Sequence, residues 1–167
     1  MPADPATRGL GGEPLEICIG EESQGKPRSR TRGRGLIEVL DTRFFIEHFF
    51  SSDPPVREAT RNRIQELRRR KEGVVPLIVI AEFTDQACRF AGRREAEAKA
   101  EAIVESGLQI RPLDPTMAVA AGCLRCTNRH VPLADCIIAT VADSLGGRVV
   151  SDDSHFKQLR GIRVSWL

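Results

Sequence analysis

Short apolar runs in this sequence repeatedly end at an acidic residue, and this pattern limits the folds that the chain can adopt. Four such acids are Asp41 in VLDTRF, Glu82 in VIAEF, Asp135 in PLADCIIA and Asp153 in VVSDDSHF. In open parallel sheets, ligands bind in the crevice beyond the carboxyl ends of the strands. We therefore predict that these four acids converge on one crevice.

Converging carboxylates carry a large electrostatic cost. Two unit charges about 5 Å apart repel by roughly 3 kcal/mol at an effective dielectric constant near 20. Such a cluster must either hold protons or bind divalent cations. Carboxylate oxygens are hard ligands that suit Mg²⁺ or Mn²⁺, so metal-dependent chemistry is the leading hypothesis.

The composition indicates one globular domain with reduced thiols. The chain has 167 residues, of which 41% are hydrophobic and 29% charged, and this is enough for a sizeable core. The longest apolar stretch, residues 74–81, is far shorter than the roughly 20 residues of a membrane span, and no secretory signal is visible. We therefore expect a cytoplasmic location. Five irregularly spaced cysteines do not resemble a secreted disulfide framework.

Residues 1–35 differ from the rest of the chain. They are rich in Gly, Pro, Arg and Glu and have only a brief apolar stretch at residues 15–19, so we expect a flexible N-terminal extension before a domain at 36–167. Basic residues concentrate at 26–34 and in an expected helix at 56–72. Either stretch could attract phosphates, but a disordered tail and a solvated helix face are the favoured interpretation.

The sequence pattern of residues 36–167 predicts strands that alternate with helices. Helices are expected directly after Asp41 and at 56–72, 77–89, 93–106, 115–125, 132–145 and 153–159, and strands at 36–40, just before Pro76, and at 108–113, 148–151 and 162–166. The run VVPLIVIAEF fits a buried strand or a buried helix, and Pro76 favours a short strand followed by a helix. This alternation indicates an α/β fold with a mainly parallel sheet covered by helices on both faces.

The ordered motifs resemble those of PIN-domain nucleases, most closely the VapC-type toxins of toxin–antitoxin pairs. The resemblance covers about residues 36–167. It rests on VLDTRF, VIAEF, DCIIATVADSLGG and SDDSHF, the last of which fits Thr or Ser, any residue, Asp, any two residues, Phe. It implies a three-layer α/β/α sandwich, metal-dependent hydrolysis of RNA, a small VapB-like antitoxin as partner, and a homodimer.

The resemblance also assigns roles to individual positions. The metal-binding and catalytic acids would be Asp41, Glu82, Asp135 and Asp153. Thr42 and Ser151 would support the acidic pocket through their hydroxyls, and Asp152 could share the task of its neighbour Asp153. Arg43 stands where Asn is common in the family, and it could pair with a carboxylate and lower the charge of the pocket.

Other candidate residues have weaker support. Cys123 and Cys126 have the spacing of a zinc half-site, but no second pair follows, so structural cysteines on a helix are expected. His155 is either a contact near the acids or a surface residue. Two functions compete with the toxin: an RNA-maturation PIN nuclease, and a non-catalytic PIN scaffold that binds RNA or protein.

Overall fold

The computed structural model describes residues 35–167, so the prediction of a flexible N-terminal extension lies outside the described residues, apart from Gly35. The strands are Glu38–Leu40 (β1), Gly73–Pro76 (β2), Gln109–Arg111 (β3), Arg148–Val150 (β4) and Val164–Ser165 (β5). The helices are Thr42–Phe50 (α1), Pro54–Arg70 (α2), Leu77–Ala91 (α3), Arg93–Val104 (α4), Pro115–Thr127 (α5), Leu133–Ser144 (α6) and Ser154–Gln158 (α7). The expected alternation of strands and helices is therefore confirmed.

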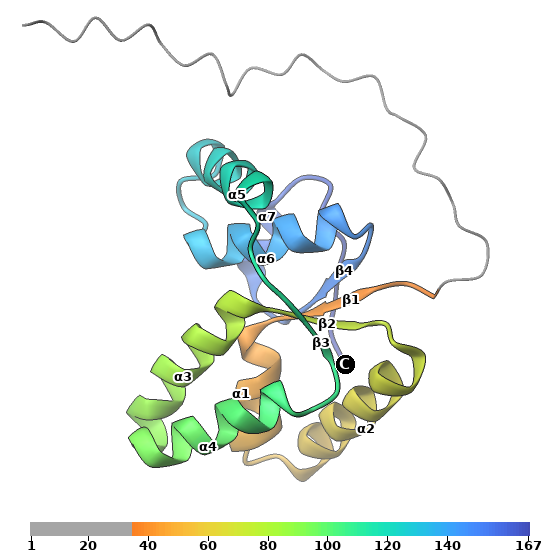
Figure 1. Cartoon of the computed structure of the whole chain (residues 1–167), viewed down its shortest axis with the longest axis vertical. Coiled ribbons are helices and arrows are strands. Elements are labelled where there is room, and N and C mark those ends of the chain that lie inside the picture. Colours follow the sequence, from red (N-terminus) through yellow and green to blue (C-terminus); the bar gives the residue numbers. More distant parts are fainter. Residues whose placement is uncertain (1–34) are drawn as a thin grey trace, which may run out of the picture.

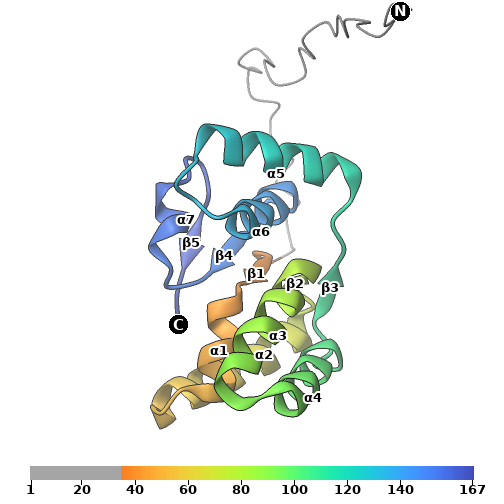
Figure 2. The same cartoon turned by 90° about the vertical axis from the view of Figure 1, so that its left-hand side faces the viewer.

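The five strands form one parallel sheet in the order β3-β2-β1-β4-β5. Helices α1 to α4 gather on one side of the strands, while α5 and α6 cover the other side with α7 beside them (Figures 1 and 2). The predicted three-layer α/β/α fold is confirmed. The strand order reverses direction between β1 and β4, and a reversal of this kind opens a crevice at the carboxyl edge of a sheet.

The central strands are buried on both faces, as expected for a parallel sheet between helix layers. Val39 and Leu40 of β1 are inaccessible to solvent, and Val74, Val75 and Val149 on the neighbouring strands are almost fully buried. Aromatic side chains of α1 extend this core towards α3, where Phe45 lies edge-to-face against Phe83. The ends of β1 and β4 are therefore held in place by a tightly packed core.

Two local sequence signals place helix α3 and strand β4 beside the crevice. Pro76 ends β2 and has an extended backbone (φ −60°, ψ 138°), and α3 begins at the next residue, as the sequence predicted. Gly146 has a left-handed backbone (φ 61°), and a Cβ on Gly147 would lie 2.7 Å from the Ile37 carbonyl oxygen. This close approach of the chains brings β4 into register with β1.

No helix within residues 35–167 combines the length and the apolar character needed to cross a lipid bilayer.

Candidate metal centre at the carboxyl edge of the sheet

Asp41 occupies the boundary between β1 and α1. Its side chain caps α1 by accepting a 2.6 Å hydrogen bond from the Thr42 N–H, which is a role that Asp favours at helix N-termini. Its backbone N–H donates to the Val150 carbonyl at 3.3 Å. The end of β1 is therefore tied to the end of β4, and the Asp41 carboxylate faces the crevice between them.

Ser151 connects the loops that follow these two strands. Its hydroxyl donates to Asp41 Oδ2 at 2.6 Å and accepts a 3.0 Å hydrogen bond from the Asp153 N–H. The side chain is almost completely buried. One hydroxyl therefore orients two of the predicted acids.

The two remaining acids come from helices on opposite sides of the sheet. Glu82 lies on α3 and accepts a 2.9 Å hydrogen bond from the Thr42 hydroxyl. Asp135 lies in the first turn of α6, where the helix dipole favours a negative charge. All four predicted acids are close enough for the charges of the other three to raise the pKa of Asp135.

His155 completes the innermost part of the cluster. Its Nδ1 lies 3.1 Å from Asp135 Oδ2 and 3.0 Å from Asp153 Oδ1. Within residues 35–167, these are the only three ligating side chains whose donor atoms all lie within 4.8 Å of one another. Asp41 and Glu82 are not members of this group. The Ser151 hydroxyl links Asp41 to the Asp153 backbone, and Thr42 links Glu82 to Asp41.

The ionisation of the cluster reflects its burial. The pKa of Asp135 is raised to about 7, mainly by burial and also by the charges of Asp41, Asp153 and Glu82, while the neighbouring His155 acts in the opposite direction. Burial also raises the pKa of Asp41, although the Ser151 hydroxyl and the backbone N–H groups hold it down. The pKa of Glu82 is raised mainly by burial. These shifts indicate that the surrounding side chains supply too little positive charge to offset the carboxylates.

The donor set fits a divalent cation. Only 9% of the Asp135 surface is exposed, yet among the described residues its Oδ2 has no hydrogen-bond partner. His155 Nδ1 is likewise buried without one, because its short contacts do not have hydrogen-bond angles. Unpaired buried polar atoms are costly, and a shared cation would satisfy both. Asp135, Asp153 and His155 are the residues best placed to hold it.

Arg43 does not enter this group. Its Nε lies 3.2 Å from Asp152 Oδ1, its Nη2 lies 3.3 Å from Asp152 Oδ2, and Nη2 also contacts Glu47. Both Asp152 oxygens therefore contact a guanidinium, whereas the Asp153 carboxylate turns towards Asp135 and His155. The expected pairing of Arg43 with a carboxylate is confirmed, and its partner is Asp152.

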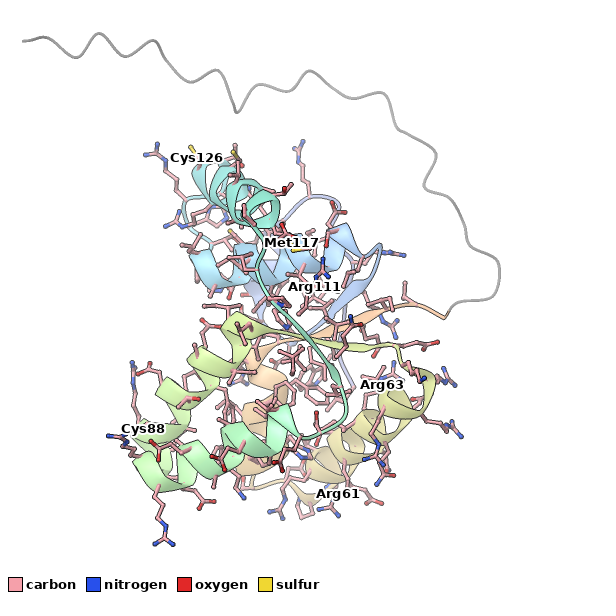
Figure 3. The ribbon with its side chains drawn as sticks, in the orientation of Figure 1. Arg61, Arg63, Cys88, Arg111, Met117 and Cys126 are labelled. Carbon is pink, nitrogen blue, oxygen red and sulfur yellow. The ribbon has the colours of Figure 1, made fainter. Side chains whose placement is uncertain are left out.

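The cysteines lie apart from the acidic cluster. Cys123 and Cys126 are on α5, and Figure 3 shows Cys126 far from Cys88 on α3. Cys123 is half-buried and Cys126 is exposed, so a structural role for this pair stays a prediction. His155 was left open by the sequence. One sequence signal could have identified it as part of the site. His155 lies two residues after Asp153, in the helix turn that the Asp153 side chain caps.

The sequence profile of the PIN domain matches residues 39–162, which is most of the chain. The chain therefore belongs to the PIN domain family. No curated protein sequence matches it.

Solved structures share the fold. A chain of VapBC2 from Rickettsia felis, solved bound to a promoter DNA fragment, has a TM-score of 0.64 at 18% identity and covers 78% of this chain and 98% of its own. A chain of DNA-bound VapBC from Salmonella typhimurium gives 0.63 at 22% identity, with coverages of 79% and 98%. VapC20 from Mycobacterium tuberculosis, described as a Sarcin-Ricin loop cleaving toxin, gives 0.58 at 19% identity, with coverages of 72% and 93%.

Proposed function

We propose that this protein is a metal-dependent endoribonuclease, a VapC-type toxin restrained by a VapB-like antitoxin. The observation that carries this proposal is the convergence of four carboxylates at the reversal point of a PIN-domain sheet, where a buried Asp135 oxygen has no hydrogen-bond partner among residues 35–167. The family resemblance supports RNA as the substrate, and the fold is similar to that of VapC20, which is described as a Sarcin-Ricin loop cleaving toxin. An RNA substrate also agrees with the cytoplasmic location expected from the sequence.

The acidic residues would each have a distinct task. Asp135 and Asp153 would hold a divalent ion, and Asp41 and Glu82 would lie next to them and add negative charge to the site. Ser151 and Thr42 would keep these carboxylates aimed at the crevice, because each hydroxyl donates to one of them. Bound Mg²⁺ or Mn²⁺ supplies charge neutralisation, polarises a phosphoryl oxygen and lowers the pKa of an attacking water.

Without such an ion the pocket would repel a phosphodiester. The pKa of Asp135 near 7 means that its proton must leave before the carboxylate can bind a cation at full strength. The family resemblance implies products with 5′-phosphate and 3′-hydroxyl ends, and hydrolysis by water is compatible with them because it needs no 2′-hydroxyl nucleophile. Specificity for RNA would then come from its shape and from single-stranded loops.

A direct cleavage assay tests this proposal. Purified protein is incubated with structured RNA and Mg²⁺ or Mn²⁺, then with EDTA, and then as the Asp135→Asn variant. Asp85→Asn, which changes an exposed acid on α3, is the matched control and should cleave normally. RNA cleavage that survives both EDTA and Asp135→Asn would reject the metal mechanism.

The partner assignment needs a separate test. Several similar structures are VapBC complexes, which supports an antitoxin partner and, with the family resemblance, a homodimer. Co-expression with a small DNA-binding protein encoded next to this gene should give a stable complex that no longer cleaves RNA. A nuclease that binds no such protein and cleaves one precursor RNA would instead be a maturation enzyme.

The scaffold alternative has less support. Arg43 and the long N-terminal extension are the features that favour it; the extension lies outside the described residues, and Arg43 contacts Asp152 and Glu47 and none of the four predicted acids. Binding of RNA without any cleavage in the assay above would still favour a scaffold. Exposed arginines on α2, such as Arg61, would then be the first contacts to change (Figure 3).

A further inference from the structure

The imidazole of His155 lies in an unusual place for a structural histidine. Its Nδ1 lies between two carboxylate oxygens, at 3.1 Å from Asp135 Oδ2 and 3.0 Å from Asp153 Oδ1. The ring comes from the short helix α7, directly after the loop that carries Asp153. The nitrogen is buried, whereas the side chain as a whole remains 37% exposed, so the ring turns its Nδ1 edge inwards.

A simple hydrogen-bonded pair does not explain this contact. Neither short distance has the angle that an N–H donor needs, and Nδ1 and Asp135 Oδ2 both lack hydrogen-bond partners among residues 35–167. Asp153 Oδ1 already accepts the backbone N–H of His155 at 2.8 Å. The three side-chain atoms therefore lie close together without a hydrogen bond from Nδ1 to either carboxylate.

The spacing matches neighbouring ligands of one small cation. Ligands of an octahedral ion bound at 2.0–2.1 Å lie about 2.9–3.0 Å apart when they occupy adjacent positions. The two distances from His155 Nδ1 are 3.0 and 3.1 Å. One oxygen from each carboxylate and one imidazole nitrogen would then leave the remaining positions for water and substrate.

We propose that His155 Nδ1 is the third protein ligand, with Asp135 and Asp153, of the divalent ion in the acidic site. This inference rests on the proposed function, because it names one more ligand of the same site. A nitrogen ligand changes the metal preference, since Mg²⁺ favours oxygen donors and imidazole suits first-row transition ions. The site therefore prefers Mn²⁺ to Mg²⁺ more strongly than a site of carboxylates alone.

Electron paramagnetic resonance of bound Mn²⁺ tests this directly and needs neither RNA nor activity. The wild-type protein loaded with Mn²⁺ should show hyperfine coupling to a directly bound nitrogen, and the coupling should change when histidine is labelled with ¹⁵N. The sequence holds three histidines, and His48 is occupied by a 3.0 Å contact with the Thr60 hydroxyl. Substitution of the exposed His130 by Gln is the matched control and should leave the spectrum unchanged.

His155→Asn sharpens the test, because its amide oxygen branches from the same carbon position as Nδ1. The variant should fold, lose the nitrogen coupling and bind Mn²⁺ at least about tenfold more weakly. Its affinity for Mg²⁺ should change by less than about threefold, because an oxygen donor stays in place. His155→Ala should weaken the binding of both ions.

Each outcome separates this inference from the proposed function. If Mn²⁺ binds and RNA is cleaved but the wild-type spectrum shows no bound nitrogen, His155 is not a ligand and the nuclease stands. If the coupling persists in His155→Asn, the inference is also overturned. If the coupling is lost in His155→Asn but no RNA is cleaved by the wild type, the ligand is established and the nuclease function fails.

Discussion

Strand β1 has a buried carboxylate at each end, Glu38 as its first residue and Asp41 directly after its last. Two arginines compensate Glu38. Arg63 of α2, labelled in Figure 3, donates from Nε to Glu38 Oε2 at 2.8 Å, and Arg148 of β4 donates from Nε to Oε1 at 3.0 Å. Within residues 35–167, Asp41 receives hydrogen bonds only from Ser151 and backbone N–H groups, and burial raises its pKa.

This difference separates a structural charge from one that is kept for binding. At the amino edge of the sheet, the positive partners of Glu38 are part of the chain, so the charge holds α2, β1 and β4 together. At the carboxyl edge, no arginine or lysine contacts Asp41, Glu82 or Asp135 within the described part of the chain. The missing positive charge is what a divalent cation would supply.

Matched amide substitutions at the two ends of β1 should give opposite results, and this is the largest effect we expect. Asp41→Asn should lower RNA cleavage by more than about 100-fold, because even residues that only support metal ligands affect activity by roughly 10–100-fold. Its unfolding free energy should change by less than about 1 kcal/mol, since Asn is an equally good helix cap. Cleavage rates and denaturant titrations measure the two effects.

Glu38→Gln should show the reverse pattern. It leaves two arginines without their carboxylate, and because their side chains are 27% and 31% exposed, we expect a loss of only about 1–3 kcal/mol of stability. Cleavage per folded molecule should stay within about twofold. A Glu38→Gln variant that is fully stable but inactive would contradict the separation of roles.

Ser151→Ala should give the next largest effect, because one hydroxyl supports two acids. Its removal frees Asp41 Oδ2 and leaves the Asp153 N–H without its acceptor. We expect metal affinity to fall roughly 10–100-fold and stability to fall by about 1–2 kcal/mol. Calorimetric titration with Mn²⁺ measures the affinity. Ser144→Ala is the control, because that hydroxyl donates only to the Val141 carbonyl of its own helix. Equal affinities for both variants would remove Ser151 from the site.

The pH dependence of the metal-free protein should follow Asp135. Its pKa rises from 3.8 to about 7 on folding, so between these values the folded state holds a proton that the unfolded state has released. The resulting stabilisation is complete below about pH 4 and is lost as the pH rises through 7. The melting temperature should therefore fall between pH 5 and 8, and Asp135→Asn should flatten this fall.

Cation binding should respond in the opposite direction. Mn²⁺ must displace the Asp135 proton, so its affinity should rise roughly tenfold per pH unit below 7 and level off above it. Added Mn²⁺ should then restore the melting temperature at pH 8. A stability profile that rises with pH in the absence of metal would show that Asp135 is not the group with the raised pKa.

Local sequence signals were sufficient for the fold and for the four acids. Pro76 between two apolar runs and the glycines before β4 marked the element boundaries, and an acid that ends a buried strand is confined to one edge of a parallel sheet. The position of Asp41 beside Asp153 also needs the pairing of β1 with β4, which the local signals did not predict. The ligand role of these acids stays a proposal.

Side-chain pairing between distant segments was not accessible to the same reasoning. Glu38 looked like one polar residue in an apolar strand, and its partner Arg148 is 110 positions away, so the pairing depends on the register of β1 with β4. His155 depends on the direction of one ring after a capped turn. Such details depend on tertiary geometry, which periodicity does not describe.

Asp152 and Asp153 offer the finest version of the comparison, because two adjacent acids of the same loop have different partners. Asp152 contacts Arg43 through both oxygens, as Glu38 contacts its arginines, but it is exposed. Asp153 faces Asp135 and His155, as an uncompensated acid of the site. Asp152→Asn should therefore change Mn²⁺ affinity and RNA cleavage by less than about threefold, in keeping with the small worth of exposed ion pairs.

Asp153→Asn should lower Mn²⁺ affinity and RNA cleavage by at least about tenfold, because it changes a proposed ligand.

Arg43→Ala distinguishes the possible reasons for a small effect of Asp152→Asn. If Asp152 is silent only because the guanidinium holds it, Arg43→Ala should increase Mn²⁺ affinity and make that affinity sensitive to Asp152→Asn. If the Asp152 side chain cannot reach the ion, the double variant should match Arg43→Ala. Equal losses in the two single Asp variants would instead mean that both acids serve the ion, and that pairing with an arginine does not mark a carboxylate as structural.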